Sequence, residues 1–198
     1  ESFVGKSTAD IRALNIDDRA LFWGKGDGAD ERTLDLGDNS SFYQGIVTTK
    51  WNNNYSTGAT PHDTNDVDTD FFLFRVAEAY LNAAEAEMHI NGEGSSKAKG
   101  YIDALRKRAH ATVSTSYTLN DVLDERAREF YFEGLRRTDL IRFNQFGGTQ
   151  ATYNWSYKGG NINGVTFDKT RNVYPIPTSE ILANRSLVQI DGYSETEN

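Results

Sequence analysis

The run ERAREFYFEGLRRTDLIRF, residues 125–143, places three glutamates where they could do acid–base chemistry. On a helix, Glu125, Glu129 and Glu133 lie one turn apart on a common stripe, so two of them could act as general acid and base in glycoside hydrolysis. However, each has an arginine close by in sequence, and a nearby guanidinium lowers the pKa of a carboxyl group instead of raising it. We therefore expect the run to be structural, with no catalytic residue, and the chain not to be an enzyme.

The same run predicts one packing face and several ion pairs. As a continuous helix it would turn one broad face to its neighbours, formed by Ala127, Phe130, Tyr131, Leu135 and Thr138. Ion pairs are predicted at helical spacing between Glu125 and Arg128, between Glu133 and Arg136 or Arg137, and between Asp139 and Arg142.

Two loop segments combine flat aromatic side chains with polar ones, as a sugar ring requires with its apolar faces and its fringe of hydroxyl groups. The first is KWNNNY, residues 50–55, with Trp51, Asn53 and Tyr55, which Trp23 of LFWGKGD can join. The second is YNWSY, with Tyr153, Trp155 and Tyr157, and with Asn154 and Asn161 nearby. The alternative is that these aromatics pack onto the scaffold, or that the Tyr-x-Trp-x-Tyr alternation is a strand with one buried face.

The remaining polar clusters predict neither a metal site nor a cofactor. Residues 27–38 and 63–70 are acidic enough to suggest Ca²⁺, but neither has EF-hand spacing, so we expect solvated loops. The three histidines have no metal-ligand spacing, and there is no cysteine for thiol chemistry, disulfides or zinc.

Helical periodicity begins at residue 71. In residues 71–90 apolar side chains recur at Phe74, Ala77, Leu81, Ala84 and Met88. A second helix follows over residues 97–110, capped by Ser95 or Ser96, with a face formed by Tyr101, Ile102, Leu105 and Ala109. A third starts after Thr118, which forms a capping-box pattern with Asp121, and runs to Gly134, which either breaks or notches it before residues 135–146 continue.

These elements predict a mainly α fold: tetratricopeptide-like (TPR-like) helical hairpins with long irregular loops and a few short strands. A short strand is expected within residues 42–51 and a capped short helix from about Thr178 to Ala183. We expect one domain over residues 1–198, made of a loop-rich ligand-face region (1–70), the helices (71–146), and loops with a C-terminal tail (147–198).

Charge and hydropathy argue against a nucleic-acid partner and against a membrane-spanning helix. The formal net charge is −8 and the arginines alternate with acids, so a nucleic-acid partner is not expected. No apolar run approaches the length of a membrane span. The N-terminus has neither Met nor a signal peptide, and we expect an excised fragment or a processed chain.

Four segments together resemble the C-terminal part of SusD/RagB family proteins: FRVAEAYLNAAEAE (74–87), ALRKRAHA (104–111), ERAREFYFEGLRRTDLIRF (125–143) and VYPIPTSEILANRSLVQIDGY (173–193). Each alone is weak, but their order and spacing are specific. The chain departs from the family pattern at Ile190 and Asp191, where Asn-Pro is usual.

The resemblance implies an outer-membrane surface lipoprotein of Bacteroidetes-type bacteria that captures glycans and passes them to a TonB-dependent, SusC-like transporter, which it caps like a lid. It implies a TPR-like scaffold whose loops build the ligand face. Membrane attachment is expected only through a lipid anchor in the missing N-terminal part. No ligand-binding residue transfers by motif, so the alternative is a TPR-like interaction scaffold that docks the transporter without touching sugar.

Overall fold

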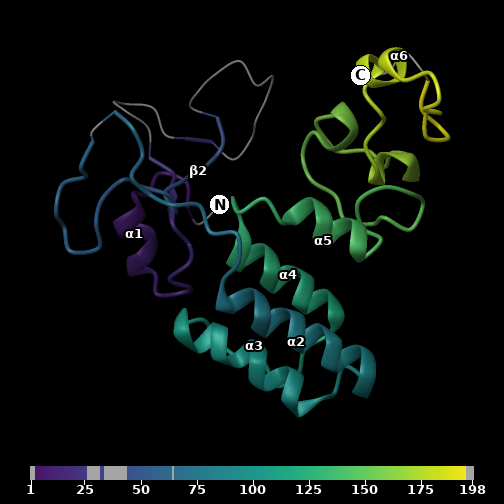
Figure 1. Ribbon diagram of the computed structural model, residues 1–198. Helices are drawn as coiled ribbons and strands as arrows, with labels where there is room; N and C mark the ends of the chain where they lie inside the picture. The colour runs from purple at the N-terminus through teal and green to yellow at the C-terminus, as the bar shows by residue number, and fades with distance from the viewer. Residues whose placement is uncertain (1–2, 26–31, 34–43, 64, 195–198) are drawn as a thin grey trace. The chain divides into compact units, whose positions relative to one another are not determined.

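The computed structural model describes residues 3–25, 32–33, 44–63 and 65–194 (Figure 1). In these ranges the chain has six α-helices, two short 3-10 helices and one two-stranded sheet, which confirms the mainly helical fold with long loops. It divides into two compact units, Glu1–Gly134 and Leu135–Asn198, each with buried residues of its own. The single domain expected from the sequence stays a prediction.

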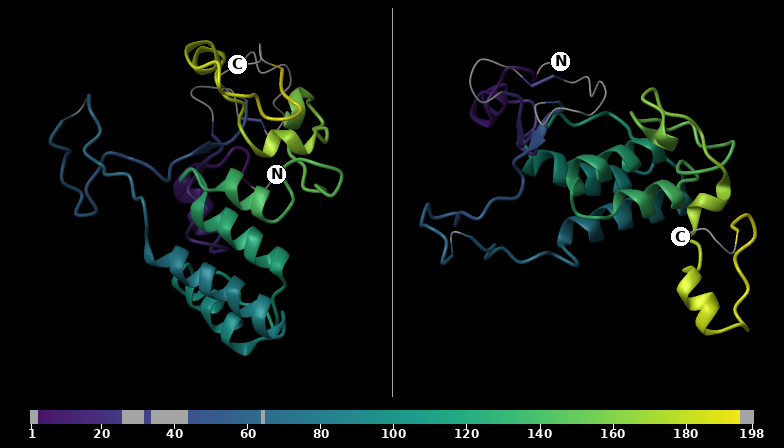
Figure 2. Two further views of the ribbon diagram at one scale, coloured as in Figure 1. Left: turned by 45° about the vertical axis from the view of Figure 1, so that its right-hand side comes forward. Right: turned by 90° about the horizontal axis from the view of Figure 1, so that it is seen from above.

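The first unit contains the predicted helical hairpin. Helix α2 (Val76–Asn91) and helix α3 (Ser96–Arg108) are joined by a short turn in which Gly92 has a φ of 86°, and Figures 1 and 2 show the two helices side by side. Ser95 is the cap of α3, since its hydroxyl accepts a hydrogen bond from the Ala98 N–H at 3.4 Å. The apolar faces are confirmed by the buried side chains Ala77, Leu81, Ala84, Met88, Ile102, Leu105 and Ala109.

Two residues of the predicted apolar faces, Phe74 and Tyr101, are not buried. Phe74 lies before α2 and is 86% exposed, because the backbone at Arg75 is still extended (φ −147°) and the helix starts only at Val76. Tyr101 is half-buried and meets Tyr80 edge to face, with ring centroids 5.8 Å apart. Phe74 therefore belongs to the loop before α2 and not to the apolar face of the helix.

Helix α4 (Leu119–Phe130) packs against α2 and begins with the capping box that the sequence predicts. Thr118 Oγ1 accepts from the Asp121 N–H at 3.2 Å, and Asp121 accepts from the Thr118 N–H at 2.7 Å. The predicted continuation to Gly134 is wrong. Tyr131 is extended, Phe132 has a φ of 59° and Gly134 has a φ of 79°, so the helix ends at Phe130.

The early end of α4 also overturns the broad packing face that a continuous helix would have formed. Phe130 is buried, but Ala127 and Tyr131 are only half-buried, and Leu135 and Thr138 lie in the second unit. Helix α5 (Arg136–Arg142) starts anew there, so the second expected hairpin, of α4 with α5, stays a prediction.

The loop-rich start of the first unit contains helix α1 (Thr8–Ala13) and strands β1 (Phe22–Trp23) and β2 (Val47–Thr48). The strands pair antiparallel, with Phe22 opposite Thr48 and Trp23 opposite Val47. The short strand expected within residues 42–51 is confirmed as β2. Residues 42 and 43 lie outside the described part of the chain, as does most of the acidic segment 27–38.

The second unit contains α5, the 3-10 helices η1 (Lys158–Gly160) and η2 (Lys169–Asn172), and helix α6 (Thr178–Ala183). Helix α6 has the predicted bounds, but its N-cap residue is Pro177, which makes no side-chain cap. Throughout the described ranges, no helix is both long and apolar enough to span a bilayer.

Candidate functional site

Trp155 of the second predicted cluster lies at the edge of a hollow in the second unit. Its side chain is 36% exposed and stacks on Phe146, with ring centroids 6.2 Å apart and planes at 25°. Tyr153 is tilted against it at 6.3 Å. The three rings form an apolar wall of the kind on which a sugar ring can lie.

The glycine at position 164 lets a neighbouring loop approach the backbone of this tryptophan closely. Gly164 has a φ of 69°, and a Cβ atom there would lie 2.4 Å from the main-chain oxygen of Trp155. Asn154 fixes the same turn, since its Nδ2 donates to the Asn163 carbonyl at 2.8 Å. The loop therefore passes directly against the backbone of Trp155.

Two arginines of α5 complete the hollow beside Trp155, which has a volume of about 410 Å³ and also touches Leu140. The guanidinium carbon of Arg136 lies 4.6 Å from the centroid of Tyr153. That of Arg137 lies 4.9 Å from Phe146 and 4.0 Å from Tyr174. Guanidinium N–H groups next to aromatic faces provide the polar edge that a glycan binder needs.

Lys158 lies behind the aromatic wall. Its side chain is 2% exposed, and its ammonium lies 4.9 Å from the Trp155 ring and 5.6 Å from the Phe167 ring while it donates to the Tyr153 carbonyl. Among the described residues no carboxylate forms an ion pair with it. Burial lowers the pKa of Lys158.

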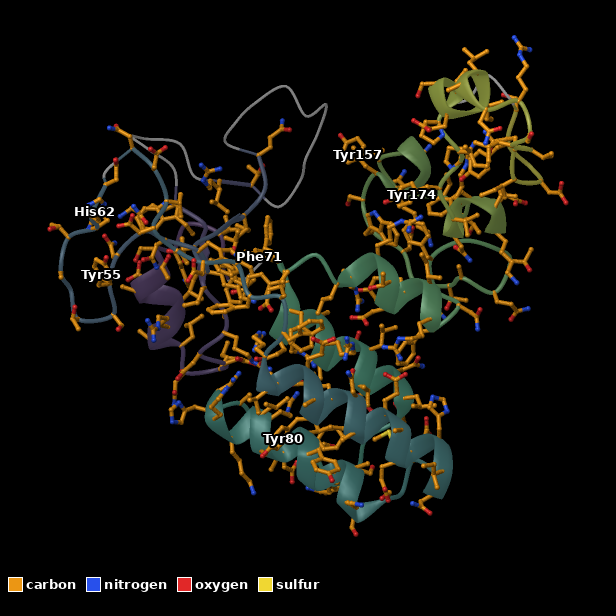
Figure 3. The ribbon with its side chains drawn as sticks, in the orientation of Figure 1. Tyr55, His62, Phe71, Tyr80, Tyr157 and Tyr174 are labelled. Atoms are coloured by element: carbon orange, nitrogen blue, oxygen red, sulfur yellow. The ribbon has the colours of Figure 1, made fainter. Side chains whose placement is uncertain are left out.

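The other polar and aromatic residues of this cluster have local roles. Tyr157 is half-buried, with a φ of 66°, and precedes η1. Figure 3 shows it on the loop that leads into η1, in the same unit as Tyr174. Asn161 accepts from the Asn163 N–H at 3.0 Å through its side chain.

Trp51 of the first predicted cluster is half-buried in an aromatic stack. Its ring centroid lies 5.8 Å from that of Phe71 and 5.9 Å from that of Phe72, and its Nε1 donates to the Phe132 carbonyl at 3.2 Å. Trp51 is half-buried whereas Trp155 is exposed, so Trp51 offers less free surface to a sugar than Trp155 does.

Asn53 ties the loop of residues 52–70 together. Its Nδ2 donates to the carbonyls of Asp63 and Asp66, both at 3.0 Å, and its Oδ1 accepts from the Asp68 N–H at 2.7 Å. Tyr55 is 50% exposed on this loop (Figure 3), and Trp23 is half-buried in β1. The structure thus joins Trp51 to phenylalanines and not to Trp23 or Tyr55 through ring contacts.

The three glutamates of the opening run lie in a buried charge network within the first unit. Glu125 pairs with Arg19 at 2.7 Å, Arg106 at 2.7 Å and Arg128 at 3.0 Å. Glu129 accepts from Arg19 at 2.9 Å and Arg108 at 2.7 Å, and also from Arg75. The predicted pair of Glu125 with Arg128 is confirmed, as is that of Asp139 with Arg142 at 3.2 Å in the second unit.

Within the first unit Glu133 pairs with Arg75 at 2.7 Å and with Lys50. Its predicted pair with Arg136 or Arg137 would join the two units and stays a prediction, although the end of α4 at Phe130 removes the helical spacing on which it was based. Lys50, Arg75 and Trp51 meet in a hollow of about 330 Å³, where the glutamates neutralise the cations.

The pKa values in this network are those of a structural site. Burial raises the pKa of Glu129, but hydrogen bonds from Arg75, Arg108 and Arg19 outweigh it and hold the pKa at about 2. The pKa of Glu133 is lowered in the same way, by Arg75 and Lys50 against burial. A general acid for glycoside hydrolysis needs a raised pKa, so neither glutamate fits that role.

Sequence reasoning missed the cations that surround both aromatic clusters. Lys50, Arg75 and Arg108 come from three separate segments, and only the fold brings them to α4. Arg136 and Arg137 are predicted partners of Glu133, but their spacing did not predict that they also contact aromatic rings within the second unit. The only available signal was the density of arginines next to Tyr and Phe in residues 125–143.

Comparison with known proteins agrees with the fold and with the sequence segments. The profile of the SusD family matches residues 19–193. The chain belongs to the SusD family.

Among curated proteins, the chain is 42% identical over 190 residues to the starch-binding protein SusD of Bacteroides thetaiotaomicron, which covers 96% of this chain and 33% of that protein. A SusD-like protein of Formosa agariphila is 32% identical over 128 residues, covering 60% of this chain and 23% of the relative. The chain thus spans about a third or less of the length of these relatives.

Solved structures give the same fold. The surface glycan-binding protein A from Bacteroides uniformis superposes with a TM-score of 0.64 at 25% identity, covering 87% of this chain and 37% of that one. A SusD superfamily protein from Bacteroides vulgatus, at 22% identity, superposes with a TM-score of 0.57 over 94% of this chain and 38% of that one.

Proposed function

We propose that this chain is part of a non-catalytic glycan-binding protein of the bacterial outer-membrane surface, which delivers its ligand to a SusC-like, TonB-dependent transporter. Family membership supports glycan binding, since relatives are named for binding starch and surface glycans. The observation that carries the proposal is the hollow beside Trp155, where an exposed indole, two further rings and two guanidiniums converge.

The residues proposed to contact glycan are Tyr153, Trp155 and Tyr157, with Trp51, Asn53, Tyr55 and Trp23 as a second group. Within the first group Trp155 is the stacking platform, because its indole is exposed and borders the hollow, which Phe146 also lines. The absence of catalysis is supported by the lowered pKa values of Glu129 and Glu133.

Affinity electrophoresis through gels that contain different polysaccharides tests this proposal. One glycan should retard the chain, Trp155→Ala should abolish the retardation, and Trp155→Phe should keep part of it, because phenylalanine can still stack on a sugar ring. The melting temperature of each variant controls for folding. Equal retardation of Trp155→Ala and the original chain would contradict this site.

The second candidate function is a scaffold that docks the transporter without contacting sugar, and one observation favours it. Phe71, Phe72, Leu73 and Phe74 are 58%, 53%, 77% and 86% exposed, an apolar run of the kind that marks protein contacts. The double variant Leu73→Ser with Phe74→Ser leaves the stack of Trp51 on Phe71 and Phe72 in place. If this apolar run docks the transporter, the variant should no longer co-purify with the transporter.

A further inference from the structure

The second unit contains a further hollow, larger than the one beside Trp155. It has a volume of about 840 Å³, and the ring-bearing side chains that line it are Phe146, Phe167, Tyr174, Pro175, Pro177 and Tyr193. Trp155 is not among the described residues that line this hollow, and Tyr174 is not among those that line the hollow beside Trp155. A substitution of Tyr174 therefore alters this hollow, the Tyr174 hollow, without removing a lining residue of the other.

The ring of Tyr174 has one covered face and one open face. The guanidinium carbon of Arg137 lies 4.0 Å from the ring centroid, a distance that places the group over one face of the ring. Because Tyr174 is nevertheless 70% exposed, the opposite face is open to solvent. An open aromatic face at the edge of a hollow is a surface on which a sugar ring can stack.

The segment around Tyr174 is fastened on several sides. Nη2 of Arg137 donates to two carbonyls of η2 at 2.9 Å and 3.4 Å, which holds the guanidinium in place behind the ring. The Tyr193 hydroxyl donates to the carbonyl of Val173 at 2.8 Å, and Pro175 restricts the backbone of the residue before it to extended conformations. A ring held in this way loses little freedom when a ligand binds.

The same two residues offer hydrogen-bonding groups for the hydroxyls of a sugar. Within the described part of the chain, the Tyr174 hydroxyl has no hydrogen-bond partner, and Nε and Nη1 of Arg137 donate to no protein acceptor. A guanidinium only donates, whereas a tyrosine hydroxyl both donates and accepts, and the hydroxyl groups of a sugar match either. The open ring and its polar surroundings thus have the two properties that a glycan contact needs.

The other guanidinium at this hollow has partners of its own. The guanidinium carbon of Arg171 lies 4.9 Å from the Tyr193 ring centroid. Hydrogen bonds from Thr170, and then the charge of Arg171, lower the pKa of Asp168, so Arg171 has a carboxylate near it. The Tyr174 hollow therefore does not require an acidic ligand, and a neutral sugar suits it.

We propose that the Tyr174 hollow is an auxiliary glycan site, in which a neutral sugar unit stacks on the open face of Tyr174 and accepts hydrogen bonds from Arg137. The inference rests on the proposed function, glycan binding at Trp155, and adds a second point of contact for the same glycan. Two linked contacts raise the affinity for a ligand long enough to use both. The auxiliary site should therefore matter for a polysaccharide and hardly at all for a short oligosaccharide.

The test compares polymers with trisaccharides of the same sugar. Affinity electrophoresis measures the dissociation constants for soluble starch, laminarin and xylan, and isothermal titration calorimetry measures those for maltotriose, laminaritriose and xylotriose. For the pair that the chain binds, Tyr174→Ala should weaken polymer binding at least about fivefold and trisaccharide binding by less than about twofold. Trp155→Ala should weaken both, because the trisaccharide binds at Trp155.

Two further variants separate stacking from packing. Tyr174→Leu keeps an apolar side chain against Arg137 but has no flat face, so it should weaken polymer binding as Tyr174→Ala does, whereas Tyr174→Phe should retain most of it. Leu182→Ala is the surface control, since Leu182 is 64% exposed in the same unit and is not among the described residues that line either hollow. Circular dichroism and the melting temperature check that each variant is folded.

A measurement on the original chain needs no variant. Hydroxyl-radical footprinting, read by mass spectrometry, should show slower oxidation of Tyr174 when the bound polymer is present than when a polymer that does not bind is present. The oxidation of Leu182 should not differ between the two. Equal oxidation of Tyr174 with both polymers would overturn the inference even if a substitution impaired folding.

The outcomes separate this inference from the proposed function. Polymer binding that Trp155→Ala abolishes and Tyr174→Ala leaves unchanged would overturn the auxiliary site, keep glycan binding and leave the Tyr174 hollow to a protein segment. Equal weakening of polymer and trisaccharide by Tyr174→Ala would overturn the claim of a separate contact. Polymer binding lost in Tyr174→Ala but kept in Trp155→Ala would support the Tyr174 hollow and overturn the site at Trp155. Silence toward every polymer would overturn both.

Discussion

Arg75, the residue before α2, donates through Nη2 to the main-chain carbonyl of Glu129 on α4 at 2.7 Å. Its guanidinium also holds the carboxylates of Glu129 and Glu133, which lie on either side of the end of α4. One side chain thus joins the start of one helix to the end of another and replaces the helical hydrogen bonds that α4 loses beyond Phe130. This is the structural role of the glutamate-rich run.

Replacing Arg75 should be strongly destabilising. Arg75→Met leaves two carboxylates buried without their main partner, and we expect the free energy of unfolding to fall by about 3–5 kcal/mol. Urea unfolding followed by circular dichroism measures it. Arg128→Met is the matched control: its side chain is 47% exposed and Glu125 keeps Arg19 and Arg106, so the loss should stay under about 1 kcal/mol. Similar losses in the two variants would contradict the network.

Stability should fall in acid because of Glu129. Its pKa is about 2 in the folded chain and about 4.3 when unfolded, so the unfolded state binds the proton more readily. The stabilisation is therefore fully present above about pH 5 and is lost as the pH falls toward 2, and it amounts to about 3 kcal/mol for this one group. Urea unfolding at pH 6, 4 and 3 measures the slope, which Glu129→Gln should reduce. An unchanged slope in that variant would assign the effect to other acids.

Two neighbouring phenylalanines should respond in opposite ways. Phe130 is 3% exposed and contacts the guanidiniums of Arg75 and Arg126, so Phe130→Ala should cost about 3–5 kcal/mol. Phe132 is 68% exposed, and Phe132→Ala removes little buried surface, so we expect a change within about 1 kcal/mol. Thermal and urea unfolding of both variants measure these losses of stability. A near-neutral Phe130→Ala would contradict the packing of α4.

The sequence was sufficient where local signals act alone. Periodicity predicted the buried faces of α2 and α3, and the Thr118–Asp121 capping box predicted the start of α4. The sequence did not predict that α4 ends at Phe130. There, Arg75 and Lys50, which are distant in sequence, donate hydrogen bonds to main-chain carbonyls at the end of the helix. The sequence also predicted Trp51 and Trp155 alike as glycan contacts, because only the fold shows that Phe71 and Phe72 stack on Trp51.

Asn53 should control the loop of residues 52–70. Asn53→Ala removes three hydrogen bonds that join the loop to itself, so limited proteolysis should cut the loop several-fold faster while the melting temperature changes little. Asn54→Ala is the control, because only its main-chain N–H takes part in a bond within the described loop. Equal cleavage rates in the two variants would show that Asn53 does not hold the loop.

The central claim, that this chain binds glycan through Trp155, is tested most directly by fluorescence from that residue alone. Trp23→Phe with Trp51→Phe leaves Trp155 as the single tryptophan, since the chain has three. Titration with neutral and acidic oligosaccharides should give a saturable change in its emission for one glycan class, with the far-ultraviolet circular dichroism unchanged. No change with any glycan, in a chain that retains its helices, would contradict the account and favour the docking scaffold.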